Sequence, residues 1–250
     1  MKAMITLHQL DESPFCDKVR RALHWKRIPY RIHELSMLQV LTRLGRVNPI
    51  RKVPALELDG RVVADSTDIA YFLDQQWPER PLLPRDPAER ALCHFLEDWA
   101  DESLYYYELR LRFTFPKNRP RWIAALLAHD APSLRPLFSP VISRTIRKQC
   151  AAQGIGRKPD EMVLRDLDRQ MDALAAWLAG KSWLVGSGLT LADIAVYAQL
   201  RCIDGTEEGH ARLSARPMIQ EWMSRVADAT AKPVEAGASA PREGSQSATG

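Results

Sequence analysis

The sequence contains little cysteine and no long apolar run. Its 250 residues include four cysteines, and no two of them stand in a C-x-x-C pair; they are Cys16, Cys93, Cys150 and Cys202. Such wide spacing excludes a zinc finger or ribbon, so we expect reduced thiols and no metal site. No stretch approaches the roughly 18 apolar residues of a membrane span, and no signal-like segment precedes the first expected strand. These absences predict a cytoplasmic protein that does not associate with membranes.

Neither charge nor composition points to a polymeric partner. The net charge is +4, hydrophobic residues make up 46% of the chain and charged residues 26%. This balance is typical of a soluble globular protein and gives no reason to expect nucleic acid as a partner. One local basic cluster is interpreted as a solvated face, with an anionic substrate or partner as the alternative. The cluster consists of Arg110, Arg112, Lys117, Arg119 and Arg121.

The first 77 residues alternate between strand and helix patterns. Apolar spacing predicts strands at 4–8, 30–34, 55–58 and 61–63 and helices at 14–25, 38–47 and 66–76. Asp59-Gly60 predicts a hairpin between the last two strands, and Asn48-Pro49 stops the middle helix. The order β-α-β-α-β-β-α requires a mixed sheet, parallel in one half and antiparallel in the other.

A proline-rich segment divides the chain. Between Trp77 and Pro87 stand four of the 17 prolines, so residues 78–87 are predicted to be an inter-domain linker. Residues 88–231 show helical patterns and predict an all-helical second domain, with long helices at 88–113 and 161–178. Residues 232–250 have no apolar period and are expected to be disordered.

A helix-capping signature stands out in the second domain. Thr190 precedes Asp193 by three residues, which is the spacing of a capping box, and Leu189 and Ile194 flank it as a hydrophobic staple. We therefore assign Asp193 a role in folding and none in catalysis.

Three motifs in the first domain and one in the second together resemble the glutathione transferase superfamily. They are Ser13-Pro14-Phe15-Cys16, the segment 48–56, Asp65-Ser66 and the segment 189–197. The resemblance covers nearly the whole ordered chain. It implies a thioredoxin-like α/β N-terminal domain, an all-α C-terminal domain, glutathione as co-substrate and a homodimer.

A second likeness raises a different function. The segment 153–157, Gln-Gly-Ile-Gly-Arg, resembles the metaxin and failed-axon-connections branch of the superfamily. That branch includes proteins not established as transferases. The alternative to an enzyme is therefore a non-catalytic binding or interaction protein with the same fold.

The resemblance assigns the peptide backbone of glutathione to two motifs. Val53 would pair with the cysteinyl residue as with an added strand, and Pro54 after it would be cis, although it could instead simply begin a strand. Asp65 and Ser66 open a helix, whose N-terminus suits the γ-glutamyl α-carboxylate while Asp65 faces the α-ammonium. The alternative for both residues is ordinary capping.

The remaining contacts with glutathione are implied by the same resemblance. Lys52, with Arg51 as a possible substitute, would lie near the glycyl carboxylate, although a lysine on a loop is usually only solvated. Phe15 belongs to the same set of contacts.

Ser13 and Cys16 are the two candidate catalytic residues. A free thiol with a pKa near 8.5 is only a few per cent ionised at neutral pH, so the site must favour the thiolate. Ser13 is placed to donate a hydrogen bond to it, and its alternative role is to cap the helix that Pro14 begins. Cys16 is expected to pack in the core, but an exposed Cys16 would indicate thiol exchange with glutathione instead.

A small electrophile is expected to bind between the domains. Tyr105 and Tyr106 are the candidate walls, because helical spacing can turn only one or two rings of the run 105–107 inward. Packing of these rings in the core is an equally good interpretation. The sequence therefore predicts a glutathione transferase that activates the thiolate for attack on a small electrophile, with no metal.

Overall fold

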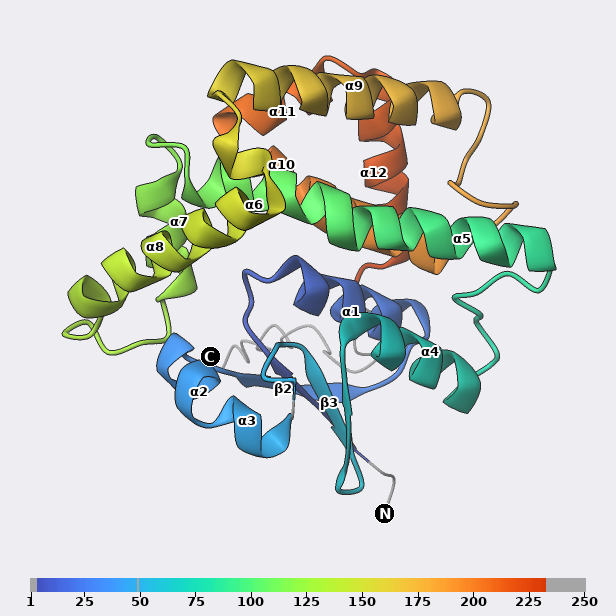
Figure 1. Cartoon of the computed structure of the whole chain (residues 1–250). Coiled ribbons are helices and arrows are strands. Elements are labelled where there is room, and N and C mark those ends of the chain that lie inside the picture. Colours follow the sequence, from blue (N-terminus) through green and yellow to red (C-terminus); the bar gives the residue numbers. More distant parts are fainter. Residues whose placement is uncertain (1–3, 49, 233–250) are drawn as a thin grey trace, which may run out of the picture.

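The computed structural model describes residues 4–48 and 50–232. The expected disorder of 233–250 and the role of Pro49 as a helix stop lie outside the described residues. Figure 1 shows a smaller domain with a sheet beneath a larger helical domain. The expected α/β domain followed by an all-α domain is confirmed.

The first domain is a mixed four-stranded sheet with helices. Its strand order is β2-β1-β3-β4, in which β1 pairs parallel with β2 and antiparallel with β3. The elements are β1 (Ile5–Gln9), α1 (Pro14–Trp25), β2 (Tyr30–Glu34), α2 (Met37–Thr42), α3 (Leu44–Val47), β3 (Ala55–Leu58), β4 (Arg61–Ala64) and α4 (Ser66–Gln76).

Alternation along the strands supplies the core of this domain. Leu7 of β1 stands opposite Leu56 of β3, and both are fully buried. They belong to one apolar cluster with Val19 and Leu23 of α1 and Ile69 of α4. Burying one face of the sheet under α1 and α4 leaves the carboxyl end of β1 and the start of α4 near the second domain.

The expectation of one helix over 38–47 is wrong. The chain forms two short helices instead, because Arg43 leaves the helical path with φ −116°. No residue of α2 is buried, whereas Leu44 at the start of α3 packs with Leu10 and Leu35 in a small separate cluster. Tertiary packing of Leu44 thus overrides the local helical period.

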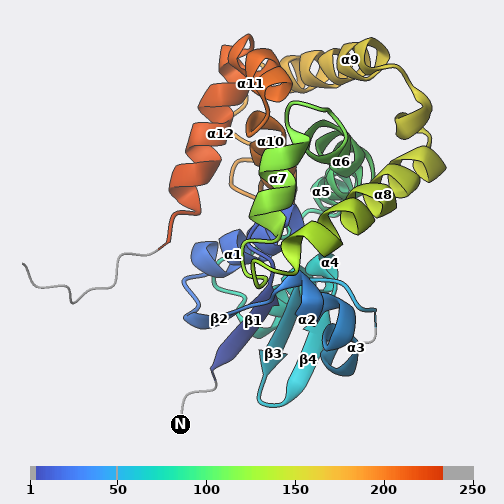
Figure 2. The same ribbon diagram turned by 90° about the vertical axis from the view of Figure 1, so that its left-hand side faces the viewer.

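Ten helical segments of the described chain form the second domain. They are α5 (Pro87–Trp99), η1 (Ala100–Leu104), α6 (Tyr105–Phe113), α7 (Arg119–Leu126), α8 (Arg135–Gln153), η2 (Ile155–Arg157), α9 (Asp160–Leu178), α10 (Leu191–Asp204), α11 (Glu207–Ser214) and α12 (Pro217–Ala229). Figure 2 shows α10 inside this domain, with α9 and α11 at the end away from the sheet and α12 running from that end toward α1.

The long helix expected at 88–113 is present, but a π-helical turn interrupts it. Residues 100–104 form this wider turn, in which the Tyr105 N–H bonds to the Ala100 carbonyl five residues earlier. Such turns are rare and often occur at functional sites because they rotate the side chains that follow.

The capping box of α10 is confirmed. The Asp193 carboxylate accepts hydrogen bonds from the backbone N–H and the hydroxyl of Thr190, both at 2.9 Å. It also accepts from the Leu184 N–H at 2.8 Å and the Trp222 indole at 2.9 Å. Asp193 is therefore the centre of a buried network that fastens α10 to α12.

Candidate functional site

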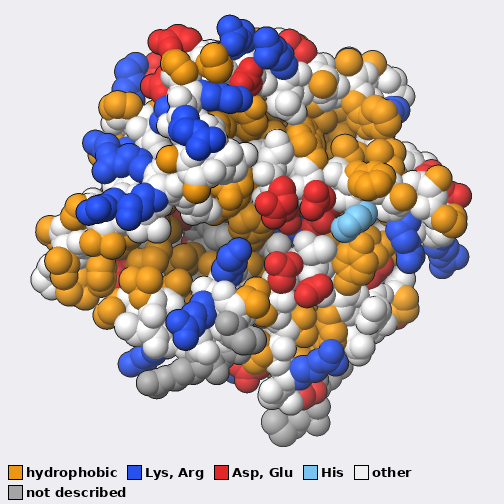
Figure 3. All heavy atoms as spheres, in the orientation of Figure 1, with side chains coloured by type: hydrophobic (Ala, Val, Ile, Leu, Met, Phe, Trp, Pro, Cys, Tyr) orange, Lys and Arg blue, Asp and Glu red, His pale blue; other side chains and the backbone are white. Residues whose placement is uncertain are grey.

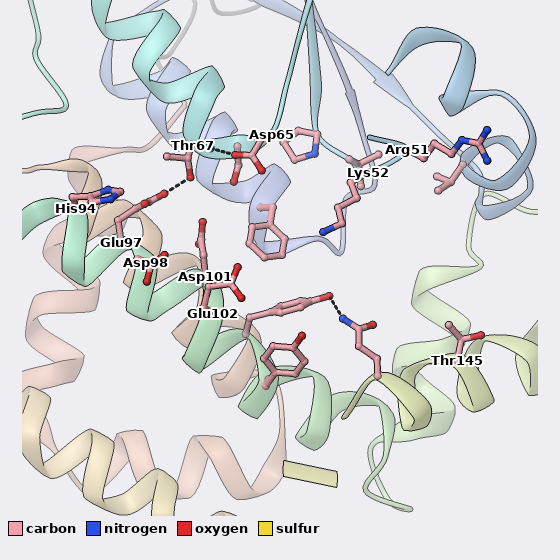
Figure 4. A pocket seen from close by; sticks show the side chains of 18 residues that line it. Arg51, Lys52, Asp65, Thr67, His94, Glu97, Asp98, Asp101, Glu102 and Thr145 are labelled. Carbon is pink, nitrogen blue, oxygen red and sulfur yellow. Dashed lines mark hydrogen bonds between the residues drawn. The ribbon is translucent and has the colours of Figure 1, made fainter. Parts of the chain in front are cut away.

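A cavity of about 630 Å³ lies between the two domains. Six residues that the sequence assigned to glutathione line its first-domain side, and they come from three separate segments. They are Phe15, Lys52, Val53, Pro54, Asp65 and Ser66. Figure 4 shows this wall facing the helix of the second domain that carries Asp98 and Glu102.

The segment before β3 presents an unpaired backbone edge. The Val53–Pro54 peptide bond is cis, as expected. No hydrogen bond within the described residues uses the N–H or C=O of Val53. Val53 is partly exposed and lines the cavity, so its backbone groups are available to an extended peptide.

The start of α4 forms the next part of the wall. Asp65 caps the helix by accepting from the Thr67 N–H at 2.8 Å, and Ser66 is buried at the first helical position. Asp65 has φ +76°, a conformation that costs a non-glycine residue on the order of 1–3 kcal/mol. A helix N-terminus whose N–H groups face a cavity is suited to bind an anion, and the strained Asp65 stands next to these groups.

Lys52, rather than Arg51, reaches toward the centre of the cavity. Figure 4 shows the Lys52 ammonium extended toward the cavity and the Arg51 guanidinium directed away from it. Both side chains are exposed. One positive charge is thus placed at the end of the wall opposite to the start of α4.

Two tyrosines and a phenylalanine form an aromatic surface across the domain boundary. The Phe15 and Tyr105 ring centroids are 4.9 Å apart, and those of Tyr105 and Tyr106 are 5.3 Å apart. Burial raises the pKa of the Tyr105 phenol, whose oxygen accepts a hydrogen bond from Gln149 at 3.5 Å. Tyr107 points into the core, so two of the three consecutive rings line the cavity.

Two family models match the chain. The model described as "Glutathione S-transferase, N-terminal domain" covers residues 7–81, and "Glutathione S-transferase, C-terminal domain" covers 136–229. The chain belongs to the glutathione S-transferase family. The expectation drawn from the motifs is confirmed at this level.

Curated relatives match over part of their length. Glutathione S-transferase U4 of Arabidopsis thaliana is 34% identical over 93 residues, which are 37% of this chain and 42% of that protein. Probable maleylacetoacetate isomerase 2 of Drosophila melanogaster is 39% identical over 79 residues, 30% of this chain and 35% of that protein. The chain thus spans less than half the length of these two relatives.

Solved structures support the fold over most of the chain. The β-etherase LigF from Sphingobium sp. strain SYK-6 has a TM-score of 0.65 at 22% identity, covering 90% of this chain and 95% of that one. Glutathione S-transferase III in its apo form has a TM-score of 0.64 at 21% identity, covering 93% and 98%.

Ser13 lies at the start of α1 and not in the wall of the cavity. Its hydroxyl caps the helix by accepting from the Cys16 N–H at 3.4 Å, a long contact for a hydrogen bond. One residue, Pro14, separates it from Phe15, which does line the cavity.

Cys16 is buried, and the thiol-exchange interpretation is therefore corrected. Its side chain has no exposed surface, and burial raises the pKa of the thiol to about 12. The hydrogen bond from Ser13 lowers that pKa but does not offset desolvation. A protonated thiol inside the core does not attack a disulfide.

A buried ion cluster at the cavity was missed by sequence reasoning. The Lys18 ammonium of α1 bonds to Glu97, to Asp101 at 2.6 Å and to the Thr67 hydroxyl at 3.1 Å. Glu97 and Asp101 lie in the second domain, on α5 and η1. The sequence feature that could have revealed this ion cluster is a lysine within the apolar face of α1, next to Val19.

Asp101 lines the cavity, and one of its two carboxylate oxygens has no hydrogen-bond partner among the described residues. Its Oδ1 is buried without a hydrogen-bond partner among the described residues, while Oδ2 binds Lys18. Burial raises the pKa of Asp101 to about 6, Lys18 opposes the rise, and Glu97 adds to it.

The second-domain wall is acidic beyond this cluster. Asp98, Glu102 and His94 also line the cavity, and Figure 3 shows acidic side chains gathered beside a histidine on this face. Within the described residues, no group of three or more His, Cys, Asp or Glu side chains could hold a metal ion. In the same part of the chain, no helix combines the length and the apolar character needed to cross a bilayer.

The basic cluster read from the sequence is not one solvated face. Arg112 is buried with 1% of its surface exposed and pairs with Glu108 at 2.9 Å. Arg110 pairs with Asp160 at 2.7 Å. Helical geometry and tertiary partners thus separate the members of the cluster, and Lys117 and Arg121 remain exposed.

Asp130 is a further residue that the sequence did not reveal. It lies between α7 and α8, and its carboxylate accepts from the N–H groups of Met37 at 2.9 Å and Leu38 at 3.0 Å. The second domain thereby caps α2 of the first domain. Because Val40 of α2 lines the cavity, this contact helps to set the width of its mouth.

Proposed function

We propose that this chain is a glutathione S-transferase in which Ser13 stabilises the glutathione thiolate for attack on a small electrophile. The observation that carries the proposal is the cavity, which joins the Val53 edge, the α4 N-terminus and Lys52 on one wall. The Val53 edge matches an extended peptide, the α4 N-terminus matches an α-carboxylate, and Lys52 matches a second carboxylate. The membership of the family supports the same ligand.

Each end of glutathione meets a complementary group. The γ-glutamyl carboxylate would face the N–H groups and hydroxyl at Ser66, while its α-ammonium would lie between Asp65 and the free oxygen of Asp101. Lys52 would pair with the glycyl carboxylate. The cysteinyl backbone would pair with Val53, which directs the sulfur toward the start of α1.

Ser13 and α1 would then lower the pKa of the bound thiol. A hydroxyl donor and the positive end of a helix together supply about 2 kcal/mol or more in favour of the thiolate. The proton passes to solvent, the sulfur forms a bond to the electrophilic carbon, and the leaving group departs with its electron pair. Phe15, Tyr105 and Tyr106 would hold an apolar or aromatic electrophile beside it.

We expect Ser13→Ala to lower turnover with little change in glutathione affinity, and Ser66→Ala chiefly to weaken affinity. The first change removes a donor that acts on the thiolate, and the second removes a contact with the γ-glutamyl end. Turnover of a general aromatic electrophile and calorimetric titration of glutathione measure the two effects.

Cys16→Ala is the control for this pair, because the buried thiol has no role in the proposed step. Its turnover should equal that of the wild type. Full activity of Ser13→Ala, combined with a loss in Cys16→Ala, would contradict the assignment of Ser13.

A non-catalytic binding protein is the second candidate function, and one observation bears on it. Ser13 does not line the cavity, and a binding protein would have no need of its hydroxyl there. The glycines of the metaxin-like segment have structural roles, because Gly154 ends α8 with φ +116° and Gly156 packs against the backbone of Ala151. Glutathione binding without any fall in its thiol pKa would favour the binding protein.

The proposal also covers the cellular location and the oligomeric state of the protein. We place it in the cytoplasm, where glutathione is reduced, and we expect a homodimer. The four free cysteines are buried, which suits a protein that meets no oxidising compartment.

A further inference from the structure

The turn that precedes Ser13 is held from two sides. Residues Leu10–Ser13 form a tight turn in which the Ser13 N–H bonds to the Leu10 carbonyl at 3.1 Å. The carbonyls of the two central residues, Asp11 and Glu12, each accept a hydrogen bond from an arginine. Surface turns usually leave these groups to water.

One of the arginines belongs to the first domain. Arg20 of α1 donates to the Asp11 carbonyl at 3.1 Å and to the Gln9 side chain at 2.9 Å. This contact ties the turn to the helix that begins at Ser13.

The other arginine, Arg112, comes from α6 in the second domain. Its Nη2 donates to the Glu12 carbonyl at 2.9 Å, and its Nη1 donates to Glu108 at the same distance. The guanidinium carbon lies 4.1 Å from the ring centroid of Trp122. Arg112 and Glu108 each expose only 1% of their surface, so the group has little freedom to move.

We propose that Arg112 is a positioning residue for Ser13, and this proposal rests on the proposed function. The Glu12 carbonyl belongs to the peptide unit that also contains the Ser13 nitrogen, so a shift of this carbonyl moves Ser13 directly. A misplacement of about 1 Å at a reacting group can lower the rate about 100-fold. The second domain thus sets the position of the hydroxyl at the start of α1.

The geometry requires a forked donor at this position. Arginine reaches Glu108 with one terminal nitrogen and Glu12 with the other, whereas a lysine ammonium acts as a single point of charge. Arg112→Lys therefore keeps a cation beside Glu108 and weakens or loses the bond to the Glu12 carbonyl. This variant separates neutralisation of Glu108 from positioning of the turn.

The test measures the pKa of the bound glutathione thiol, by ultraviolet absorbance of the thiolate, together with kcat and KM. For Arg112→Lys we expect a raised thiol pKa and a kcat lowered about tenfold or more, with KM for glutathione within about twofold. Arg216→Lys is the matched control, because Arg216 bonds to Asp172 and to the Arg212 carbonyl, away from the turn. The control should leave all three quantities unchanged.

A double variant guards against a simple failure to fold. Replacing a buried ion pair by apolar residues of similar size is often neutral or stabilising, so Glu108→Leu with Arg112→Met should preserve the second domain. It removes the bond to Glu12 and should show the same rise in thiol pKa and the same fall in kcat. If neither Arg112 variant folds, the proposal is wrong, because it requires the tether to be separable from folding.

A variant cycle with Ser13 decides whether Arg112 acts through this residue. In a Ser13→Ala background, Arg112→Lys should have almost no further effect on kcat or on the thiol pKa. An equal loss in both backgrounds, or wild-type values in the single variant, overturns the proposal. If the wild type itself fails to bind glutathione or to lower its thiol pKa, the proposed function fails instead.

Discussion

Two carboxylates share one buried ammonium where the domains meet the cavity. Lys18 and Glu97 expose 1% and 3% of their side chains, and Asp101 exposes 14%. The ammonium compensates about one negative charge. A second negative charge therefore has a high free-energy cost in this buried position. That cost is the reason why Asp101 retains its proton up to a pH of about 6.

Glutathione affinity should rise as the pH rises from about 5 to about 7. Asp101 loses its proton in this window, since its folded pKa is about 6, and the carboxylate then attracts the α-ammonium. Asp101→Asn should flatten the dependence, as measured by calorimetric titration at several pH values.

His94→Asn is the control for this window, because His94 is a second ionisable side chain in the same cavity. This variant should keep the dependence on pH. A flat profile in the wild type would show that Asp101 does not contact the ammonium.

The titration of Asp101 should also affect the stability of the fold. Its contribution to stability falls as the pH rises, whereas glutathione affinity rises. A carboxyl whose folded pKa is raised above 3.8 stabilises the fold at low pH, and this contribution is lost as the pH rises through about 6. Binding of a cation to Asp101 would lower its pKa and offset the loss.

At the scale of helices, aspartates bind backbone groups at the start of three helices, and at α2 the Ser36–Gln39 capping box acts beside Asp130. Asp193 organises the start of α10, Asp130 caps α2 from the other domain, and Asp86 caps α5 from the adjacent loop. Their burial differs greatly, because Asp193 is fully buried whereas Asp86 is exposed. Equal capping chemistry should therefore give unequal energies.

Asp193→Ala should lower the free energy of unfolding by about 3 kcal/mol or more, because it leaves several buried donors without an acceptor. The usual value for a helix cap alone is about 1 kcal/mol. Denaturant unfolding measures the loss. Glu221→Ala, an exposed residue on α12, should stay within about 0.5 kcal/mol of the wild type, and a similar small loss for Asp193→Ala would contradict the buried network.

Asp130→Ala should lower stability by about 1–2 kcal/mol and also weaken glutathione binding, because α2 borders the cavity. Asp86→Ala provides the comparison. It removes a cap of the same kind, on the N–H groups of Ala88 and Glu89. Unfolding experiments should show the larger loss for Asp130→Ala, because Asp130 is buried whereas Asp86 is exposed. Titration should show a lower affinity only for Asp130→Ala, and unchanged affinity there would exclude α2 from the binding site.

At the scale of the whole molecule, one continuous apolar core joins the two domains. Leu23 of α1 and Leu200 of α10 belong to the same buried cluster. Lys18, Arg112 and Asp130 add polar contacts across this boundary at three places around the cavity. The domains should therefore unfold together.

Lys18→Met should cost about 3–5 kcal/mol, because it leaves Glu97 and Asp101 buried without a cation. Unfolding followed by fluorescence and by circular dichroism should give one coincident transition with a lower midpoint. Lys117→Ala should change the midpoint little, since Lys117 and Glu207 are both 72% exposed. Two separate transitions in the wild type would show that the domains are not coupled.

Local signals in the sequence determined most of the elements, and the resemblance to the family pointed to the residues that form the first-domain wall of the cavity. Strands 30–34 and 55–58 and the helix that begins at Ser66 appear as expected, because alternation, turn residues and caps act over a few positions. The π-helical turn and the break at Arg43 depend on packing against residues that are far away in the sequence. The local pattern of residues carries no information about such packing.

The polar contacts that shape the site were decided only by the tertiary structure. Lys18 meets Asp101 across 83 positions, Asp130 meets Leu38 across 92, and Arg112 meets Glu12 across 100. A side chain's burial and charge state depend on such partners, since desolvation and pairing act through space rather than along the chain. For this reason the sequence could predict that Cys16 packs in the core, whereas the rise that desolvation causes in the pKa of its thiol followed only from the packing of α1.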